Sequence, residues 1–263
     1  MTTRLSHATQ SEHVPYEIYA DAPLATDLLT IRAHQFTVAV KKLGRPVDRT
    51  EWAMTSAEVN AYYQPRANQM VFPAGILQPP FFSKDYDPAR NFGSIGSIVG
   101  HELTHGFDAT GRHYDASGTL HDWWSNETAH EFTKRTQCLV EQYGRYNVSS
   151  TTDPTHVLGH VNGQYTLSEN IADNGGVKLA FHAYQAARAT HNATGDKLFF
   201  LSFAQTFCAK RSDQAMTEKL ASDPHAPERW RINGVASNSH DFARVFQCPV
   251  TARMNPPTKC QVW

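Results

Sequence analysis

The sequence lacks the charge pattern of a protein that binds nucleic acid. Its 263 residues include 24 Lys and Arg against 25 Asp and Glu, so the net charge is close to zero. The basic residues form no run that could follow a phosphate backbone or an anionic lipid surface. We therefore expect no nucleic acid among the partners of this chain.

Long hydrophobic segments are also absent. The longest, residues 198–209, has roughly a dozen residues, whereas a membrane-spanning helix needs about 20. Residues 1–23 lack the apolar core of a secretory signal peptide, so the sequence reveals no export signal of its own. The apolar segment instead predicts a buried helix.

Cysteine is scarce and widely spaced. The four positions exclude a zinc ribbon and a CxxC redox pair, and they leave disulfides and buried free thiols as open alternatives. They are Cys138, Cys208, Cys248 and Cys260. Three N-glycosylation sequons lie in polar surroundings that suit a surface, at Asn126, Asn147 and Asn192. Chance alone would produce one or two of them.

The remaining composition is that of a globular protein, with 40% hydrophobic residues and no internal repeats. Apolar periodicity and capping signals predict helices over residues 23–44, 94–107, 126–143 and 166–189. Alternation around a Pro-Arg-Ala-Asn turn predicts a hairpin with strands at 59–63 and 70–72. Thr166 and Glu169 fit a capping box at the start of the last helix.

One short stretch, HELTH at residues 101–105, has the spacing of a metal site. Positions i and i+4 lie one above the other on a helix, so His101 and His105 can direct two imidazoles at one point. Glu102 lies beside that point. This pattern alone is a moderate signal, because two polar residues can share a helix face for other reasons.

A catalytic zinc site usually has three protein ligands, so a third must come from elsewhere in the chain. Glu169 in SENIAD is the best candidate, with Asp173 four residues later on the same helix face. Asp173 and Asp108 could each orient a ligating imidazole through its free N–H group. A capping role is the plainer alternative for Glu169 taken by itself.

Taken together, these motifs identify a family resemblance. The sequence resembles the neprilysin and endothelin-converting enzyme family of zinc metallopeptidases, from about Val14 to Trp263. The motifs that match occur in the order found in the family, and they are VNAYY, VFPAGILQPPFF, IVGHELTHGFD, ENIADNGG, HAPERWRINGVASN and MNPPTKCQVW.

The resemblance implies one Zn²⁺ per chain, with His101, His105 and Glu169 as ligands. It implies Glu102 as the general base that takes a proton from zinc-bound water, and it places Asp173 beside a ligating histidine. His225 would donate to the oxyanion of the tetrahedral intermediate. Without the resemblance, His225 would be interpreted as an ordinary loop or core histidine.

The resemblance also implies how a peptide is held. Arg231 would bind a substrate carbonyl, and Asn60 and Ala61 would pair with the peptide as an added edge strand. An apolar pocket on the leaving-group side would favour cleavage before bulky hydrophobic residues. Its lining residues would be Ile76, Phe81, Ile98 and Phe207, each of which could otherwise be ordinary core.

Family members are much longer and carry a helical lobe that closes over the site. We expect residues 1–50 to be a remnant of that lobe and residues 51–263 to be the catalytic domain, either as a truncated product or as part of a larger ectodomain. The lobe would then come from the full-length gene product. Extracellular or membrane-tethered localisation, glycosylation and a Cys138–Cys260 disulfide follow from the resemblance alone, and Cys208 and Cys248 would lack their partners unless they pair with each other.

The expected fold is α+β, mainly helical and of the zincin type, with the metal-binding helices packed beneath a small mixed sheet and the Asn60 hairpin at its edge. The leading hypothesis is a zinc endopeptidase that hydrolyses oligopeptides. The alternative is a truncated, non-catalytic remnant that keeps zinc and binds peptides.

Overall fold

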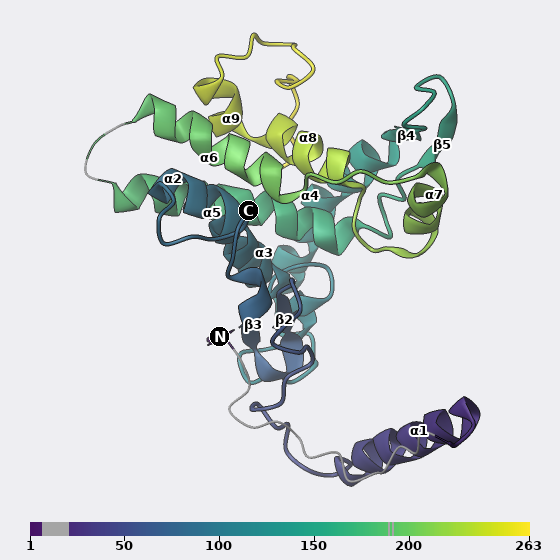
Figure 1. Cartoon of the computed structure of the whole chain (residues 1–263). Coiled ribbons are helices and arrows are strands. Elements are labelled where there is room, and N and C mark those ends of the chain that lie inside the picture. Colours follow the sequence, from purple (N-terminus) through teal and green to yellow (C-terminus); the bar gives the residue numbers. More distant parts are fainter. Residues whose placement is uncertain (7–20, 189, 191) are drawn as a thin grey trace.

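The computed structural model describes residues 1–6, 21–188, 190 and 192–263, and helices make up most of it (Figure 1). The mainly helical α+β class is confirmed. In chain order the strands and α-helices are β1 Thr2–Ser6, α1 Leu24–Lys41, β2 Tyr62–Gln64, β3 Gln69–Pro73, α2 Pro88–Asn91, α3 Ser97–His105, α4 Asn126–Gly144, β4 Asn147–Ser149, β5 Val157–His160, α5 Leu167–Ala187, α6 Ala193–Thr206, α7 Asp213–Ser222, α8 Glu228–Asn238 and α9 His240–Val245.

The main sheet is small and mixed, as expected. Its order is β1-β3-β2, with β3 parallel to β1 and antiparallel to β2. The predicted hairpin is present, but β2 begins at Tyr62 rather than at residue 59. The N–H group of Ala61 donates to Oδ1 of Asn60 at 2.9 Å, so it is not available for the strand ladder.

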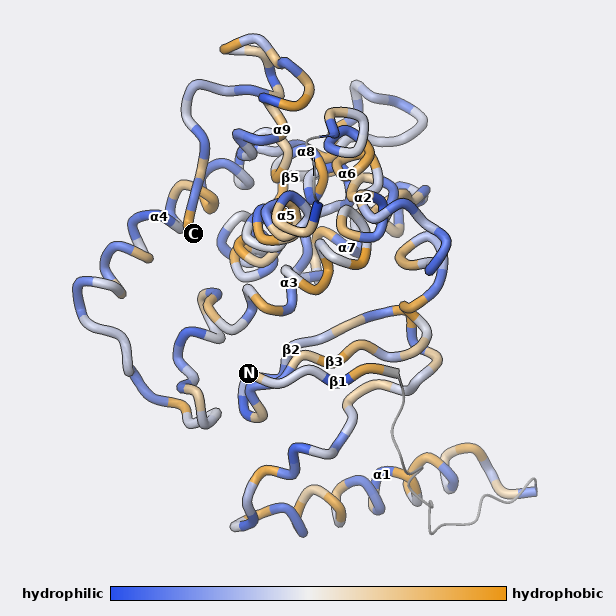
Figure 2. Tube along the Cα trace, turned by 90° about the vertical axis from the view of Figure 1, so that its left-hand side faces the viewer, coloured by the Kyte–Doolittle hydropathy of each residue, from blue (hydrophilic) through white to orange (hydrophobic). Residues whose placement is uncertain are grey.

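The sheet, α3 and α5 form successive layers, with α3 in the middle (Figures 1 and 2). Apolar residues of β3 and α3 fill the space between the sheet and α3, among them Met70, Phe72 and Ile98. On its other side α3 crosses α5 very closely. A Cβ atom on Gly100 would lie 2.5 Å from the carbonyl oxygen of Gly176, so this crossing requires glycine.

Two details of the predicted helices are wrong. The regular helix α3 is shorter than residues 94–107, because a π-helical turn, Phe92–Gly96, precedes it. Thr166 is the N-cap of α5 but makes no capping hydrogen bond with its side chain. Its hydroxyl donates to the carbonyl of Asn162 and accepts from the side-chain amide of Asn170, both at 2.9 Å, which leaves Glu169 free of any capping role.

The predicted apolar helix is confirmed within α6, where Phe199, Phe200 and Phe203 are buried against α5 and α9. Within the described ranges, no helix is both long and apolar enough to cross a membrane. In contrast, α1 extends away from the rest of the molecule beyond the sheet (Figures 1 and 2). None of its residues is buried, and Leu29 and Phe36 are 67% and 71% exposed. The division at residue 50 stays a prediction.

The expected disulfide is present. Cys138 on α4 is bonded to Cys260 near the carboxyl terminus, with their Cα atoms 5.5 Å apart. Cys208 and Cys248 are free thiols, so they do not pair with each other. The three sequon asparagines are all exposed, as their polar surroundings predicted.

Candidate metal centre

The two histidines of α3 direct their imidazoles at one point. They lie four residues apart, and their Nε2 atoms are 3.0 Å from each other. His101 is buried, with 5% of its surface exposed, and His105 is partly buried. The single helical turn between them explains this convergence, because side chains at i and i+4 lie on the same face.

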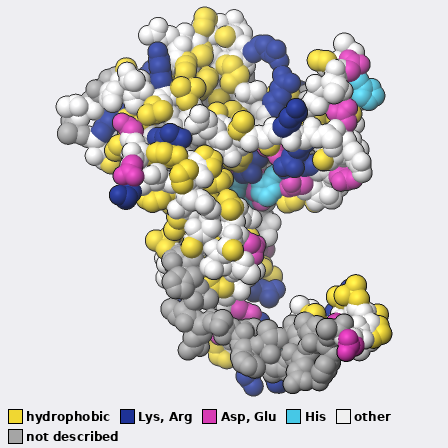
Figure 3. Space-filling model, in the orientation of Figure 1, with side chains coloured by type: hydrophobic (Ala, Val, Ile, Leu, Met, Phe, Trp, Pro, Cys, Tyr) yellow, Lys and Arg dark blue, Asp and Glu magenta, His cyan; other side chains and the backbone are white. Residues whose placement is uncertain are grey.

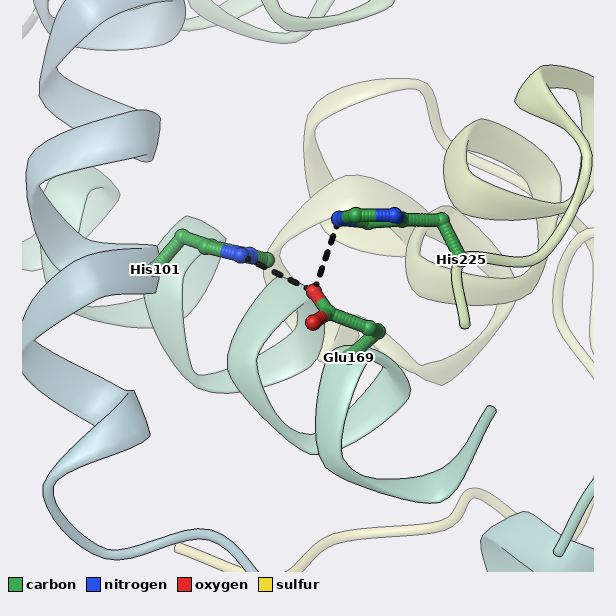
Figure 4. A group of neighbouring side chains, drawn as sticks. All are labelled: His101, Glu169 and His225. Carbon is green, nitrogen blue, oxygen red and sulfur yellow. Dashed lines mark ion pairs between the residues drawn. The ribbon is translucent and has the colours of Figure 1, made fainter. Parts of the chain in front are cut away.

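Glu169 reaches the same point from α5. Its Oε2 atom lies 3.2 Å from Nε2 of His101 and 3.5 Å from Nε2 of His105. A third imidazole arrives from the loop before α8, where Nε2 of His225 lies 3.1 Å from the same oxygen (Figure 4). Residues far apart in the sequence are therefore gathered around one carboxylate oxygen, and His101, Glu169 and His225 form a group with the spacing of metal ligands.

Each of these imidazoles is bonded through Nδ1 to an aspartate. The pairs are His101 with Asp173 at 2.8 Å, His105 with Asp108 at 2.7 Å, and His225 with Asp223 at 2.7 Å. An ionised carboxylate accepts hydrogen bonds only, so Nδ1 carries the hydrogen in each pair. In a neutral ring Nε2 then has a free lone pair directed at the shared point. The sequence indicated the first two aspartates but missed Asp223, whose position two residues before His225 was the available signal.

The nitrogen and oxygen atoms that meet at this point suit a tetrahedral cation such as Zn²⁺. Ligand atoms about 2 Å from a tetrahedral ion lie about 3.3 Å from each other, and the three separations among His101, His105 and Glu169 are 3.0, 3.2 and 3.5 Å. Oε2 of Glu169 is buried and has no well-aligned hydrogen bond. Acceptor atoms facing one another at such distances require a positive charge between them, which a metal ion or a proton on an imidazole Nε2 would provide.

The surroundings of each carboxyl group in the site shift its pKa in a definite direction. Burial opposes ionisation of Glu169, but its interactions with the three imidazoles outweigh it and hold its pKa far below the usual range. Burial likewise opposes ionisation of Asp173, and Arg231 lowers the pKa of that carboxyl. Glu102 differs, because burial dominates and raises its pKa above the ordinary value of 4.5. No hydrogen bond joins its carboxylate to another described residue, so it is available as a base.

Arg231 occupies the inner side of α8. Its Nε and Nη2 atoms donate to the two oxygens of Asp173 at 2.8 and 2.7 Å, and its guanidinium lies 4.4 Å from the ring centre of Phe207. The arginine thus anchors the aspartate that orients His101. The expected contact of Arg231 with a substrate carbonyl stays a prediction.

The residues expected to line an apolar pocket fall into two places. Ile76, Phe81 and Ile98 belong to one cluster between the sheet and α3. Phe207 lies apart from them, against Phe203 in the cluster around α6. Asn60 and Ala61 immediately precede β2, which is an edge strand of the main sheet.

A profile of peptidase family M13 matches residues 60–262. The chain is 46% identical to an endothelin-converting enzyme homolog of Locusta migratoria over 244 residues, which cover 89% of this chain and 32% of that protein. It is 44% identical to human endothelin-converting enzyme 1 over 261 residues, which cover 94% of this chain and 33% of that protein.

Solved structures show the same likeness. The crystal structure of the Mycobacterium tuberculosis zinc metalloprotease Zmp1 in complex with an inhibitor superposes with a TM-score of 0.79 at 37% identity, covering 94% of this chain and 38% of that one. The present chain spans about a third of the length of the curated relatives named above. The matched profile covers most of the chain, so the chain belongs to peptidase family M13, the family of the neprilysins and endothelin-converting enzymes.

Proposed function

We propose that this chain is a zinc-dependent endopeptidase that hydrolyses oligopeptides. The observation that carries the proposal is the convergence of His101, His105 and Glu169 at separations of 3.0 to 3.5 Å. These three residues would hold the metal. Zn²⁺ bound there would polarise the substrate carbonyl and lower the pKa of a water molecule.

Glu102 is the general base of the proposed reaction. Its carboxylate accepts a proton from the attacking water and later passes that proton to the leaving amine. The raised pKa of Glu102, which burial causes, makes it a stronger base than an exposed glutamate. Because water is the nucleophile, no covalent enzyme intermediate forms.

His225 serves as donor to the oxyanion that develops on the scissile carbonyl. Its Nε2 atom lies at the Glu169 end of the site, 3.1 Å from Oε2, and its side chain is 34% exposed, so a substrate can reach it. To donate from Nε2 while Nδ1 donates to Asp223, the ring must carry hydrogen on both nitrogens.

Peptide substrates would enter through the open side of the site. Figure 3 shows histidine reaching the surface in a recess between the helical body and the part that carries the sheet, with acidic and basic side chains beside it. We propose that the peptide extends along β2 near Asn60 and Ala61. The cluster of Ile76, Phe81 and Ile98 supports a preference for cleavage before bulky hydrophobic residues.

We also propose that the protein acts as an ectodomain. The Cys138–Cys260 disulfide and the exposed sequon asparagines suit an oxidising, extracellular environment. The exposed apolar residues of α1, such as Leu29 and Phe36, support the proposal that a lobe of the full-length gene product packs there.

The Glu102→Gln variant tests the enzymatic proposal against the non-catalytic alternative. Both the unmodified protein and the variant should hold zinc, but only the former should cleave a quenched peptide with a bulky hydrophobic residue after the scissile bond. Glu127→Gln, on the exposed first turn of α4, is the matched control and should retain full activity. Equal rates in the Glu102 and Glu127 variants would refute the mechanism, and zinc binding without any hydrolysis would favour a peptide-binding remnant.

A further inference from the structure

The side chain of Lys219 on α7 is mostly covered by its neighbours. Only 10% of its surface is exposed, and its ammonium group forms an ion pair with Asp223, four residues later. It also lies 3.9 Å from Oε1 of Glu228 at the start of α8. A lysine is seldom buried unless it is paired, so this arrangement holds Lys219 in one place.

The two oxygens of Asp223 have separate partners. Oδ2 receives the ammonium of Lys219, whereas Oδ1 accepts from the backbone N–H group of His225 at 2.9 Å and from Nδ1 of its ring at 2.7 Å. The plane of this carboxylate is thus fixed from both ends. Burial opposes ionisation of Asp223, but Lys219 and His225 outweigh it and hold the pKa at about 2.

A second ion pair, between Arg211 and Glu228, holds the carboxylate that faces Lys219 at the start of α8. Nε and Nη2 of Arg211 donate to Oε1 of Glu228 at 2.9 and 2.6 Å. Glu228 in turn faces Lys219. The network therefore joins α7, the loop that carries His225, and the start of α8.

We propose that Lys219 is a positioning residue that acts on the reaction through Asp223 and His225. By holding Oδ2 of Asp223, it keeps Oδ1 in the direction that aims Nε2 of His225 at the metal end of the site. The inference rests on the proposed hydrolysis, in which that nitrogen donates to the oxyanion. Without Lys219 the partly exposed carboxylate can rotate, and the imidazole, which is 34% exposed, loses its fixed orientation.

The plainer alternative is an ion pair that contributes only to folding. Exposed pairs contribute little to stability, and Lys134, with its Nζ 3.9 Å from Glu131 and its side chain 73% exposed, is such a pair. Lys134→Met is therefore the matched control for Lys219→Met. Lys219→Arg restores the positive charge beside Asp223.

The experiment measures peptide hydrolysis, affinity for a phosphonate peptide that mimics the tetrahedral intermediate, zinc content and urea unfolding in these three variants. Lys219→Met should lower kcat about 10-fold or more while KM changes less than about twofold, because the oxyanion donor acts in the transition state. The affinity for the phosphonate should fall by a similar factor. Lys219→Arg should recover most of both, and zinc content should be unchanged in all.

A readout that does not need activity comes from the zinc-free protein. The ¹H–¹⁵N imidazole signals of His225 should shift or broaden in Lys219→Met and remain unchanged in Lys134→Met. In addition, the double variant Lys219→Met/Asp223→Asn should be no slower than Asp223→Asn alone, because each change removes the same effect, the fixed orientation of the His225 imidazole.

Kinetics and imidazole signals of Lys219→Met that match those of Lys134→Met would overturn the proposal. The proposal would also be overturned if Lys219→Met lowered the rate only because it unfolds the protein, and if Lys219→Arg restored neither the stability nor the rate. If the unmodified protein hydrolysed no peptide while the His225 signals still moved in Lys219→Met, the proposed enzymatic function would fail and the positioning by Lys219 would stand.

Discussion

At the residue scale, the site depends on carboxylates that orient imidazoles. Asp173 has two roles, because it accepts from Nδ1 of His101 and also pairs with both Nε and Nη2 of Arg231. Its side chain is 3% exposed. It therefore fixes a proposed metal ligand and neutralises a buried guanidinium at the same time.

Replacing Asp173 with Asn should weaken zinc binding about 10- to 100-fold, since the imidazole of His101 loses its orienting acceptor. It should also lower the free energy of unfolding by about 3–5 kcal/mol, because Arg231 is left buried without its partner. Zinc titration and urea unfolding would measure the two effects. Asp122→Asn is the control, since Asp122 also binds Nδ1 of a histidine, His113, but is 86% exposed. Equal zinc affinity in both variants would contradict this account.

Spacing indicated His101 and His105, because helical periodicity is local, whereas Glu169 was only the best candidate for a third ligand until the family resemblance implied it. The same reasoning failed at Thr166, whose hydroxyl bonds to Asn162 and Asn170 instead of capping α5. Lys219 could not be found from sequence. Its i,i+4 spacing to Asp223 is local, but such pairs are common on exposed helix faces, and the partial burial of Lys219 beside Glu228 of α8 is not encoded by any local pattern.

At the element scale, the close crossing of α3 and α5 places the two proposed metal ligands of α3 opposite the one on α5. Gly100 and Gly176 allow this approach, since a Cβ on Gly176 would lie 2.5 Å from the backbone nitrogen of His101. The glycines cost helix stability, about 0.5–1 kcal/mol each relative to alanine. The packing of the two helices offsets that cost and sets the distance from Glu169 to the histidines.

Gly100→Ala should separate the two helices and destabilise the protein by about 1–3 kcal/mol, the usual effect of overpacking. It should also lower zinc affinity, because Glu169 moves away from the α3 imidazoles. Gly144→Ala provides the comparison. Gly144 is the last residue of α4, and a Cβ atom added there would meet nothing within 4 Å, so this change should be neutral or slightly stabilising. Thermal unfolding of both variants would decide, and an unaffected Gly100→Ala protein would disprove the steric account.

Helices with clear periodicity were predictable, as was the hairpin of β2 and β3, because turn chemistry and alternation are local signals. The parallel pairing of β1 with β3 was not predicted. It joins Thr2–Ser6 to a strand more than 60 residues away, and short strands carry no signal for a distant partner. The β4–β5 pair was missed as well, since its strands have only three and four residues.

At the scale of the whole molecule, the disulfide fastens the carboxyl-terminal segment to α4 across 122 residues of sequence. This segment contributes Trp263, which packs against Phe107, Trp124 and Phe132. The bond therefore holds together parts of the core that are distant along the chain. Its pairing could be expected only from the family resemblance, because four widely spaced cysteines allow several connections.

Reduction of the Cys138–Cys260 bond should destabilise the protein by roughly 4–5 kcal/mol, because closing so long a loop restricts the unfolded chain strongly. Urea unfolding with and without reductant would measure the difference. A Cys208→Ser/Cys248→Ser variant should show the same sensitivity to reductant, since both thiols are already free. No shift in the unfolding midpoint on reduction would contradict the prediction.

The central claim is that one cation joins α3 to α5 through His101, His105 and Glu169. The most direct test is the zinc content of the purified protein by mass spectrometry, measured after dialysis for the unmodified chain, for Glu169→Gln and for the Glu127→Gln control. We predict about one zinc per chain in the unmodified protein and the control, and far less in Glu169→Gln. Equal zinc in all three, or none in the unmodified protein, would contradict the account.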